Sequence, residues 1–421
     1  MTSEHDCFVH IQLPESLEVV VCGRFQHQVL PQGTGVGRFV YGRSYRERRD
    51  AVPLDPVHLP LSPRTYETAK LGGVFGALRD AAPDAWGRLV IQRVTGRSDL
   101  TELDYLLESP EDRAGALSFG RAVEPPAPVR AFNRVVQLDE LREAARRLEA
   151  GQWTAPVRDQ VRQMLEPTTS MGGARPKNTV EDDSGLWLAK FPARGDRWNS
   201  AAVEAAMLRL AARCGIRVPD TRIERVGDES VLLLRRFDRL KVEDGYHRVR
   251  MVSALTVLDA EDSPTDRANW SYLLLADELQ RWSSRPREDR AELFQRVVFN
   301  ALISNNDDHP RNHALVTATR DWRLAPAYDL TPSPQPGREE RDLALTCGVF
   351  GTRATRQNLL SASPRFGLAR EAAEAVIDEM VGVVRRYWRA EVFALGGTDT
   401  DCAAVEPAFV HGGFEFVADR E

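Results

Sequence analysis

The chain has 421 residues, of which 42% are hydrophobic and 28% are charged, and its formal net charge is −6. This is the composition of an ordinary soluble globular protein that is long enough for two or three domains. Because the 56 basic residues are spread along the chain and do not form a tract, direct nucleic-acid binding is not the expected function.

The cysteines and the lengths of the apolar runs indicate the cellular compartment of the protein. Five cysteines lie far apart without a CxxC pair, which argues against a disulfide framework and against a cysteine-based zinc site. The sequence does not open with a basic region followed by an apolar one, and no apolar run approaches the about 18 residues needed to span a bilayer. We therefore expect a cytoplasmic protein without a membrane partner.

The first 124 residues predict a subdomain that is partly β-rich and partly helical. Between Phe8 and Tyr45, the segments FVHIQL, LEVVVCGRF and RFVYGRSY favour a small antiparallel sheet. Residues 71–94 then place apolar side chains at helical spacing. GRAVEPPAPVRAF (residues 120–132) contains three prolines, which stop both helix and sheet, so we place the first domain boundary after residue 124.

The next part, residues 125–240, predicts a second domain with a Gly-rich loop. TTSMGGARPKNTV (residues 168–180) is expected to form a Gly-rich turn, and LWLAKF (residues 186–191) a strand. Residues 199–214 predict a helix that Gly215 closes, and TRIERV and VLLLRRF predict paired strands.

Beyond residue 241 the pattern is mostly helical. Residues 270–282, 291–305 and 371–388 repeat apolar positions along one helical face. A β-rich part followed by a helical part predicts the α+β class. The predicted domains are residues 1–124, 125–240 and 241–421.

NNDDHPRNHALV (residues 305–316) directly follows one of these predicted helices. In it, Asp307 and Asn312 form a DxxxxN pattern, which is typical of the catalytic loop of kinases. There the Asp accepts or orients the proton of the attacking hydroxyl, and the Asn places its amide oxygen on Mg²⁺. The spacing alone is a weak signal, because Asp and Asn also cap local turns.

Asp329 in LAPAYDLTPS supplies a second candidate ligand for Mg²⁺. This ion prefers near-octahedral oxygen ligands, usually one or two protein groups together with phosphate oxygens and water. Asp329 and Asn312 would provide the two protein groups. The alternative for Asp329 is an Asx turn.

Lys190 in LWLAKFP shares one face with two leucines if the segment is a strand. An ammonium group on an apolar face needs an anion, and an ATP phosphate is one. Glu204 in the next helix is a candidate partner, and a surface salt bridge on an edge strand is the alternative. Ahead of Lys190, Gly172 and Gly173 in SMGGARPK let backbone N–H groups approach phosphates.

A metal-dependent hydrolase is the competing interpretation of residues 305–316. His309 and His313 lie four positions apart with Asp307 and Asp308 beside them, which could serve zinc or a two-metal site. Pro310 interrupts a helix through the histidines, and no further ligand cluster follows. We favour the kinase and expect His309 to brace the loop by a hydrogen bond to the backbone near Asp307.

Five segments, SMGGARPK, LWLAKFP, LLLRRFDRL, NNDDHPRNHALV and LAPAYDLTPS, resemble in this order the HipA family of serine/threonine kinases, the toxins of bacterial toxin–antitoxin pairs. SPRTYETAKLGGVFGALRDAAPDAWGR is similar to the family's extra N-terminal subdomain. The resemblance implies a bilobal protein-kinase-like fold with ATP and Mg²⁺ between the lobes. It also implies that Asp307 is catalytic, that Asn312 and Asp329 bind the metal, and that Lys190 contacts the ATP phosphates.

The resemblance implies further roles in nucleotide binding and regulation. The Arg235 carbonyl and the Phe237 amide would face adenine as the hinge, and Asp238 would lie near the ribose. Family members are switched off by phosphorylation of a serine in the Gly-rich loop, and Ser170 matches it. About two added negative charges beside the phosphate pocket would repel ATP.

Three functions follow as hypotheses. The first is an ATP- and Mg²⁺-dependent protein serine/threonine kinase that autophosphorylates on Ser170. A small HipB-like helix-turn-helix antitoxin would restrain it and make most of the DNA contacts. The second is a small-molecule phosphotransferase with a kinase fold, and the third is an inactive binding module. Retention of Lys190, Asp307, Asn312 and Asp329 argues against the third.

Overall fold

The computed structural model describes residues 4–127, 132–152, 154, 175–263, 267–337 and 339–415. Its contacts divide the chain into two compact units that alternate along the sequence. The first unit comprises Met1–Arg194, Arg235–Val257 and Val316–Asp321, and the second Gly195–Leu234, Leu258–Leu315 and Trp322–Glu421. The predicted boundaries after residues 124 and 240 stay predictions.

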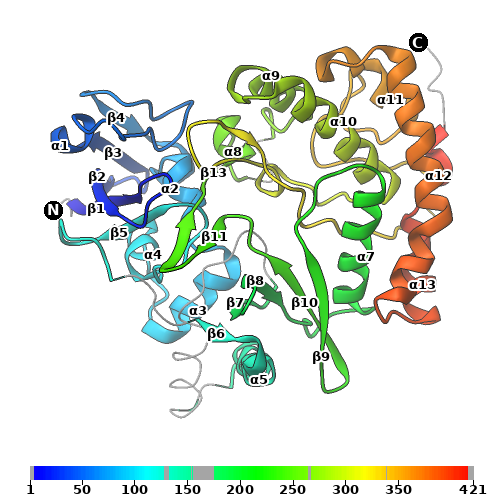
Figure 1. Cartoon of the computed structure of the whole chain (residues 1–421), viewed down its shortest axis with the longest axis horizontal. Helices are drawn as coiled ribbons and strands as arrows, with labels where there is room; N and C mark the ends of the chain where they lie inside the picture. The colour runs from blue at the N-terminus through cyan, green and yellow to red at the C-terminus, as the bar shows by residue number, and fades with distance from the viewer. Residues whose placement is uncertain are drawn as a thin grey trace. The chain divides into compact units, whose positions relative to one another are not determined.

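A five-stranded sheet in the order β4-β3-β2-β1-β5 forms the N-terminal part of the first unit. All neighbouring strands are antiparallel, which confirms the predicted small sheet and adds two edge strands. Buried and half-buried residues alternate along β3, so one face of this strand packs on the core. The strands, partly visible in blue in Figure 1, are β1 (Glu4–Gln12), β2 (Val19–Val29), β3 (Gly35–Tyr41), β4 (Thr65–Thr68) and β5 (Leu117–Gly120).

Short helices accompany this sheet, as the spacing of apolar residues predicts. Asp84 caps α3 by accepting a hydrogen bond from Gly87 N, and Thr101 caps α4 in a capping box with Asp104. The helices of this part are α1 (Arg43–Arg46), α2 (Gly76–Asp80), α3 (Ala85–Thr95), α4 (Glu102–Glu108) and α5 (Leu138–Glu149).

The first unit also contains β6 (Asn133–Arg134), β7 (Lys177–Asp182) and β8 (Gly185–Lys190). β6 pairs with β7 in parallel, and β7 pairs with β8 antiparallel. Every residue of β8 is buried, which explains why LWLAKF is an almost continuous apolar run. The predicted turn over residues 168–180 was too long, because pairing with β8 draws its last residues into β7.

The chain beyond residue 241 begins with strands, so the prediction of a mostly helical pattern was wrong there. β11 (Arg239–Val242) and β12 (Gly245–Arg248) form an antiparallel hairpin, and β13 (Arg250–Ser253) and α8 (Ala254–Val257) follow. Each of these strands has only four residues, the lower limit at which alternation of apolar residues can indicate a strand.

The second unit contains the long helices that the sequence predicts. α7 (Ser200–Arg213) is capped by Asn199, and Gly215 follows it in the left-handed region at φ 80°. α7 and α12 (Arg370–Ala394) run side by side in Figure 1. The remaining elements are β9 (Thr221–Val226), β10 (Glu229–Arg235), α9 (Tyr272–Trp282), α10 (Pro286–Leu302), β14 (Ala314–Thr317), β15 (Arg323–Leu324), α11 (Arg356–Ser361) and α13 (Asp399–Val405).

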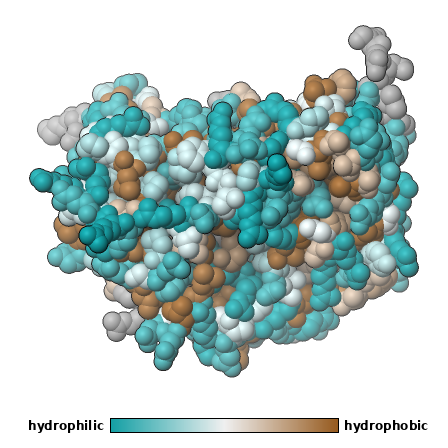
Figure 2. Space-filling model, turned by 45° about the horizontal axis from the view of Figure 1, so that its top comes forward, coloured by the Kyte–Doolittle hydropathy of each residue, from teal (hydrophilic) through white to brown (hydrophobic). Residues whose placement is uncertain are grey.

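The surface shows mixed polarity. On the face in Figure 2, hydrophilic residues predominate, and apolar residues are scattered among them. Within the part of the chain that the structure describes, no helix combines the length and the apolar character required to cross a bilayer.

Candidate active site

The loop with the DxxxxN pattern begins where α10 ends. Ser304, in the left-handed region at φ 51°, turns the chain away from the helix. His309 N then donates to Asp307 O (2.8 Å), and Asn312 N donates to His309 O (2.9 Å). These bonds close two tight turns and leave the Asp307 side chain exposed. An exposed carboxylate on a fixed loop can reach a substrate hydroxyl.

Asp308 points the other way and is completely buried. Its Oδ2 atom accepts hydrogen bonds from Asn300 Nδ2 (2.7 Å), from the Tyr272 hydroxyl and from the His313 ring (2.7 Å between Nε2 and Oδ2). Burial, followed by the charge of Asp308, raises the pKa of Tyr272 well above its ordinary value and keeps this hydroxyl protonated as a donor. Asp308 therefore anchors the loop through its buried carboxylate, a role that was not predicted from the sequence.

Asn312 has the geometry of a prepared ligand. Its Nδ2 atom donates to Asp307 O (3.3 Å), which orients the amide. Its Oδ1 atom is buried and accepts no hydrogen bond from any residue that the structure describes. Leaving a buried acceptor unpaired costs about 1–3 kcal/mol, so such an atom needs an explanation. A metal ion at this oxygen provides one.

Asp329 lies in the same unit and adopts an uncommon backbone conformation. Its φ of 59° is in the left-handed region, which costs a non-glycine residue about 1–3 kcal/mol. Immediately before it, the Tyr328 hydroxyl donates to Arg311 O (2.8 Å). The segment with Asp329 is thus tied directly to the loop with Asp307 and Asn312.

The charges around Asp307 show that the carboxylates of this region act on one another. Although Asp307 is exposed as a residue, partial desolvation of its carboxyl raises its pKa, and the negative charges of Asp329 and Asp308 raise it further, whereas His309 and Arg267 lower it. The net shift is upward, towards the range of a general base. Because a cation between Asp307 and Asp329 would relieve their repulsion, the donor set fits Mg²⁺.

His309 hydrogen-bonds the backbone at Asp307 through its own main chain. Its N–H donates to Asp307 O and its carbonyl accepts from Asn312 N, whereas its ring Nδ1 atom is buried without a hydrogen-bond partner among the described residues. The supporting role of the His309 ring stays a prediction. For the hydrolase alternative, His313 already contacts Asp308, and the described residues contain no group of three or more His, Cys, Asp or Glu arranged to hold a metal ion.

Lys190 is the last residue of β8 and is only 8% exposed. Its cross-strand neighbour is Lys177, whose ammonium forms a buried ion pair with Asp84 (2.7 Å) at the start of α3. Asp84 neutralises one of the two buried lysines. Glu204 is buried in α7, but it belongs to the second unit, so its pairing with Lys190 stays a prediction.

The predicted hinge begins at the end of β10. Arg235 lies over the Trp187 ring (5.6 Å to the centroid), and Arg236 N donates to Leu186 O (3.0 Å), which fixes the backbone next to Phe237. The contacts of Arg235 and Phe237 with adenine stay predictions, because no nucleotide is present to test them.

Asp238 lies at the centre of a buried ion-pair cluster. Its carboxylate accepts hydrogen bonds from Arg236, Arg239 and Gly115 N, and Arg236 also pairs with Asp112 (2.7 Å). Burial favours the protonated acid, but the two arginines outweigh it and hold the pKa of Asp238 well below its usual range. The contact of Asp238 with ribose stays a prediction. In the structure, its carboxylate makes hydrogen bonds and ion pairs within the protein.

The remaining predicted site residues, Ser170, Gly172 and Gly173, lie outside the described residues, and their roles stay predictions.

Comparison with known proteins identifies the relatives of this chain. The model of the HipA-like C-terminal domain matches residues 169–388, and the model of the HipA N-terminal domain matches residues 17–120. "Putative kinase Y4mE" of Sinorhizobium fredii is 26% identical over 73% of this chain and 75% of its own length. "Putative kinase Y4dM" of the same organism is 29% identical over 50% of this chain and 54% of its own length.

A solved structure shares the fold. It is described as the "Shewanella oneidensis MR-1 Toxin Antitoxin System HipA, HipB and its operator DNA complex". The match has a TM-score of 0.68 at 18% identity and covers 95% of this chain and 94% of that chain. The predicted kinase-like α+β fold with an N-terminal subdomain is confirmed.

Proposed function

The chain belongs to the HipA family, and from this premise we propose that it is an ATP- and Mg²⁺-dependent protein serine/threonine kinase. The observation that carries the proposal is the arrangement of Asp307, Asn312 and Asp329. One carboxylate is exposed with a raised pKa, one amide oxygen is buried and unpaired, and one aspartate is held at positive φ. Protein kinases use the same parts for phosphoryl transfer: a catalytic-loop Asp that accepts the hydroxyl proton, and an Asn and a second Asp that hold Mg²⁺.

Each residue has one task in the proposed reaction. Asp307 orients the substrate hydroxyl and accepts its proton. Asn312 through Oδ1 and Asp329 through its carboxylate would hold Mg²⁺, which neutralises negative charge on the ATP phosphates. Lys190 would contact the ATP phosphates.

Partner and regulation follow from the same premise. The Shewanella oneidensis relative is in a complex with HipB and operator DNA. We expect this chain to bind a HipB-like helix-turn-helix antitoxin and to contact DNA mainly through it. Autophosphorylation on Ser170 would place about two negative charges in the Gly-rich loop and so oppose ATP binding.

A transfer assay tests the proposal. The purified protein is incubated with γ-labelled ATP and Mg²⁺, alone and with cell lysate, beside Asp307→Ala. We expect label on Ser170 or on a lysate protein for the wild type, and none for the variant. Label on small metabolites alone would support the phosphotransferase alternative. Absence of transfer with any divalent metal would contradict both.

A further inference from the structure

The segment that leads to Asp329 is held by hydrogen bonds to the backbone of four of its six residues, 322, 324, 325 and 327. Residues 322–327 run through β15 and end two positions before Asp329. A segment this short has little intrinsic stability, so its conformation depends on outside partners. The main-chain bonds that fix it are Ser284 N to Trp322 O (2.9 Å), Ala325 N to Ala314 O (2.8 Å) and Ala327 N to Arg217 O (2.7 Å).

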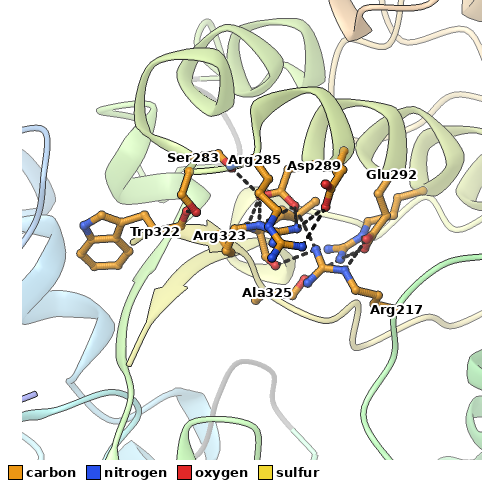
Figure 3. Close-up of polar contacts among 12 residues, drawn as sticks. Arg217, Ser283, Arg285, Asp289, Glu292, Trp322, Arg323 and Ala325 are labelled. Carbon is orange, nitrogen blue, oxygen red and sulfur yellow. Dashed lines mark hydrogen bonds and ion pairs between the residues drawn. The ribbon is translucent and has the colours of Figure 1, made fainter. Parts of the chain in front are cut away.

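The Ser284 hydroxyl also donates to Trp322 O (3.3 Å), and charged side chains make three further bonds to the backbone of this segment. Asp289 on α10 accepts from Leu324 N (2.9 Å). Arg217 donates through Nη2 to Leu324 O (3.0 Å), and Arg296 donates through Nη2 to Ala325 O. Figure 3 shows the Asp289 and Arg217 side chains directed towards Arg323 and Ala325 of this segment.

Asp289 is the centre of the cluster and is fully buried. Besides Leu324 N, its carboxylate accepts from the Ser283 hydroxyl (2.7 Å), from Arg323 Nη2 (2.8 Å) and from Arg217 Nη2 (3.1 Å). Every one of these groups therefore favours the ionised form of Asp289. Its charge fixes the segment directly and also fixes Arg217, one of the two arginines that donate to the segment.

Glu292, one helical turn further along α10, contacts both of these arginines, Arg217 and Arg296. It accepts from Arg217 Nε (2.5 Å) and from Arg296 Nε (3.2 Å). The Arg296 side chain is 1% exposed, so its guanidinium cannot adopt another position without losing these partners. Asp289 and Glu292 thus form an acidic pair on one face of α10, and they act through arginines on residues 324 and 325.

Burying so many charges is not the simplest way to stabilise a fold. A buried ion pair is often no more stable than well-packed apolar side chains of the same volume, and its best-attested contribution is to select one arrangement among several. We propose that Asp289 and Glu292 are positioning residues for the proposed kinase: they fix residues 322–327 so that Asp329 is presented to Mg²⁺. This inference rests on the proposed function. It assigns the positioning of Asp329 to two residues of α10 that lie 16 and 13 positions before the loop of residues 305–316.

The test compares Asp289→Asn with Glu288→Gln. The control removes the neighbouring carboxylate on the same helix, which is 61% exposed and contacts this segment through the Arg323 side chain (3.3 Å) and through no described backbone atom. For Asp289→Asn we expect faster hydrogen–deuterium exchange at residues 322–329 in the metal-free protein. We also expect the Mg²⁺ concentration for half-maximal transfer to rise about tenfold, as for other residues that support metal ligands. The control should match the wild type in both.

Arg217→Gln is the second variant, because Arg217 is 42% exposed and its loss should leave the fold intact. If Asp289→Asn does not fold, hydrogen–deuterium exchange and Mg²⁺ dependence are measured on Arg217→Gln instead. Unchanged exchange and unchanged Mg²⁺ dependence in a folded variant would overturn the inference. A wild type without any transfer would instead refute the proposed kinase, and the exchange measurement would still report whether the cluster holds the segment.

Discussion

At the scale of single residues, the site is defined by one unpaired acceptor atom and by one uncommon backbone conformation. Asn312 Oδ1 is buried without a described hydrogen-bond partner, and Asp329 is held at a φ of 59°. The loop could be predicted from the DxxxxN spacing, because Asp307 and Asn312 lie close together in the sequence. The conformation of Asp329 could not be predicted, because the contacts that impose it come from residues distant in the sequence.

The raised pKa of Asp307 predicts how activity depends on pH. The reaction needs ionised Asp307, so activity should fall as the pH decreases through a value above that of an ordinary aspartate. Arg267 lowers this pKa, and Arg267→Gln should therefore move the acidic limb of the kcat/KM profile to higher pH. A pH–rate profile of both proteins measures the shift. A limb that moves to lower pH would show that Asp307 is not the titrating group.

At the scale of elements, the catalytic loop is an extension of α10. The helix was predicted from its apolar stripe, but Asn300 within it contacts Asp308, which also accepts from His313 and Tyr272. The signal for this cluster in the sequence was Asn300, a polar residue in a helix that was predicted from its apolar stripe. It was not sufficient, because the partners come from two other elements and no sequence pattern joins them.

Asp308 should therefore be required for the stability of the loop rather than for the chemistry. Asp308→Asn replaces an acceptor of three hydrogen bonds with a group that also donates, and we expect the free energy of unfolding to fall by about 1–3 kcal/mol. Asn306→Ala, at an exposed position of the same loop, is the control and should change it little. Urea unfolding measures both. Equal stability of the two variants would show that the buried cluster does not hold the loop.

At the scale of the whole molecule, the chain builds two units from alternating stretches of sequence. The order of helices and strands was largely predictable, but the grouping was not, because residues 235–257 join the first unit through tertiary contacts. The cluster of Asp112, Arg236, Asp238 and Arg239 makes one such contact: it fastens the predicted hinge to the loop after α4.

This cluster should be essential for the first unit. Asp112→Ala leaves buried guanidinium charge uncompensated, and we expect the free energy of unfolding to fall by about 3–5 kcal/mol. Asp99→Ala, at a side chain that is 79% exposed, should change it little. Because the folded-state pKa of Asp238 lies below its unfolded value, its contribution is complete near neutral pH. That contribution should decline as the pH falls below about 4. Denaturant titrations of both variants at neutral pH, and of the wild type between neutral pH and pH 3, measure these effects.

The central claim is that Asn312 and Asp329 bind the metal that accompanies ATP. The most direct measurement is calorimetric binding of a non-hydrolysable ATP analogue with and without Mg²⁺, to the wild type and to Asp329→Ala. We expect Mg²⁺ to strengthen binding to the wild type about tenfold or more and to have little effect on the variant, whose metal-free binding should be retained. Equal strengthening by Mg²⁺ in both proteins would contradict the assignment of Asp329 as a metal ligand.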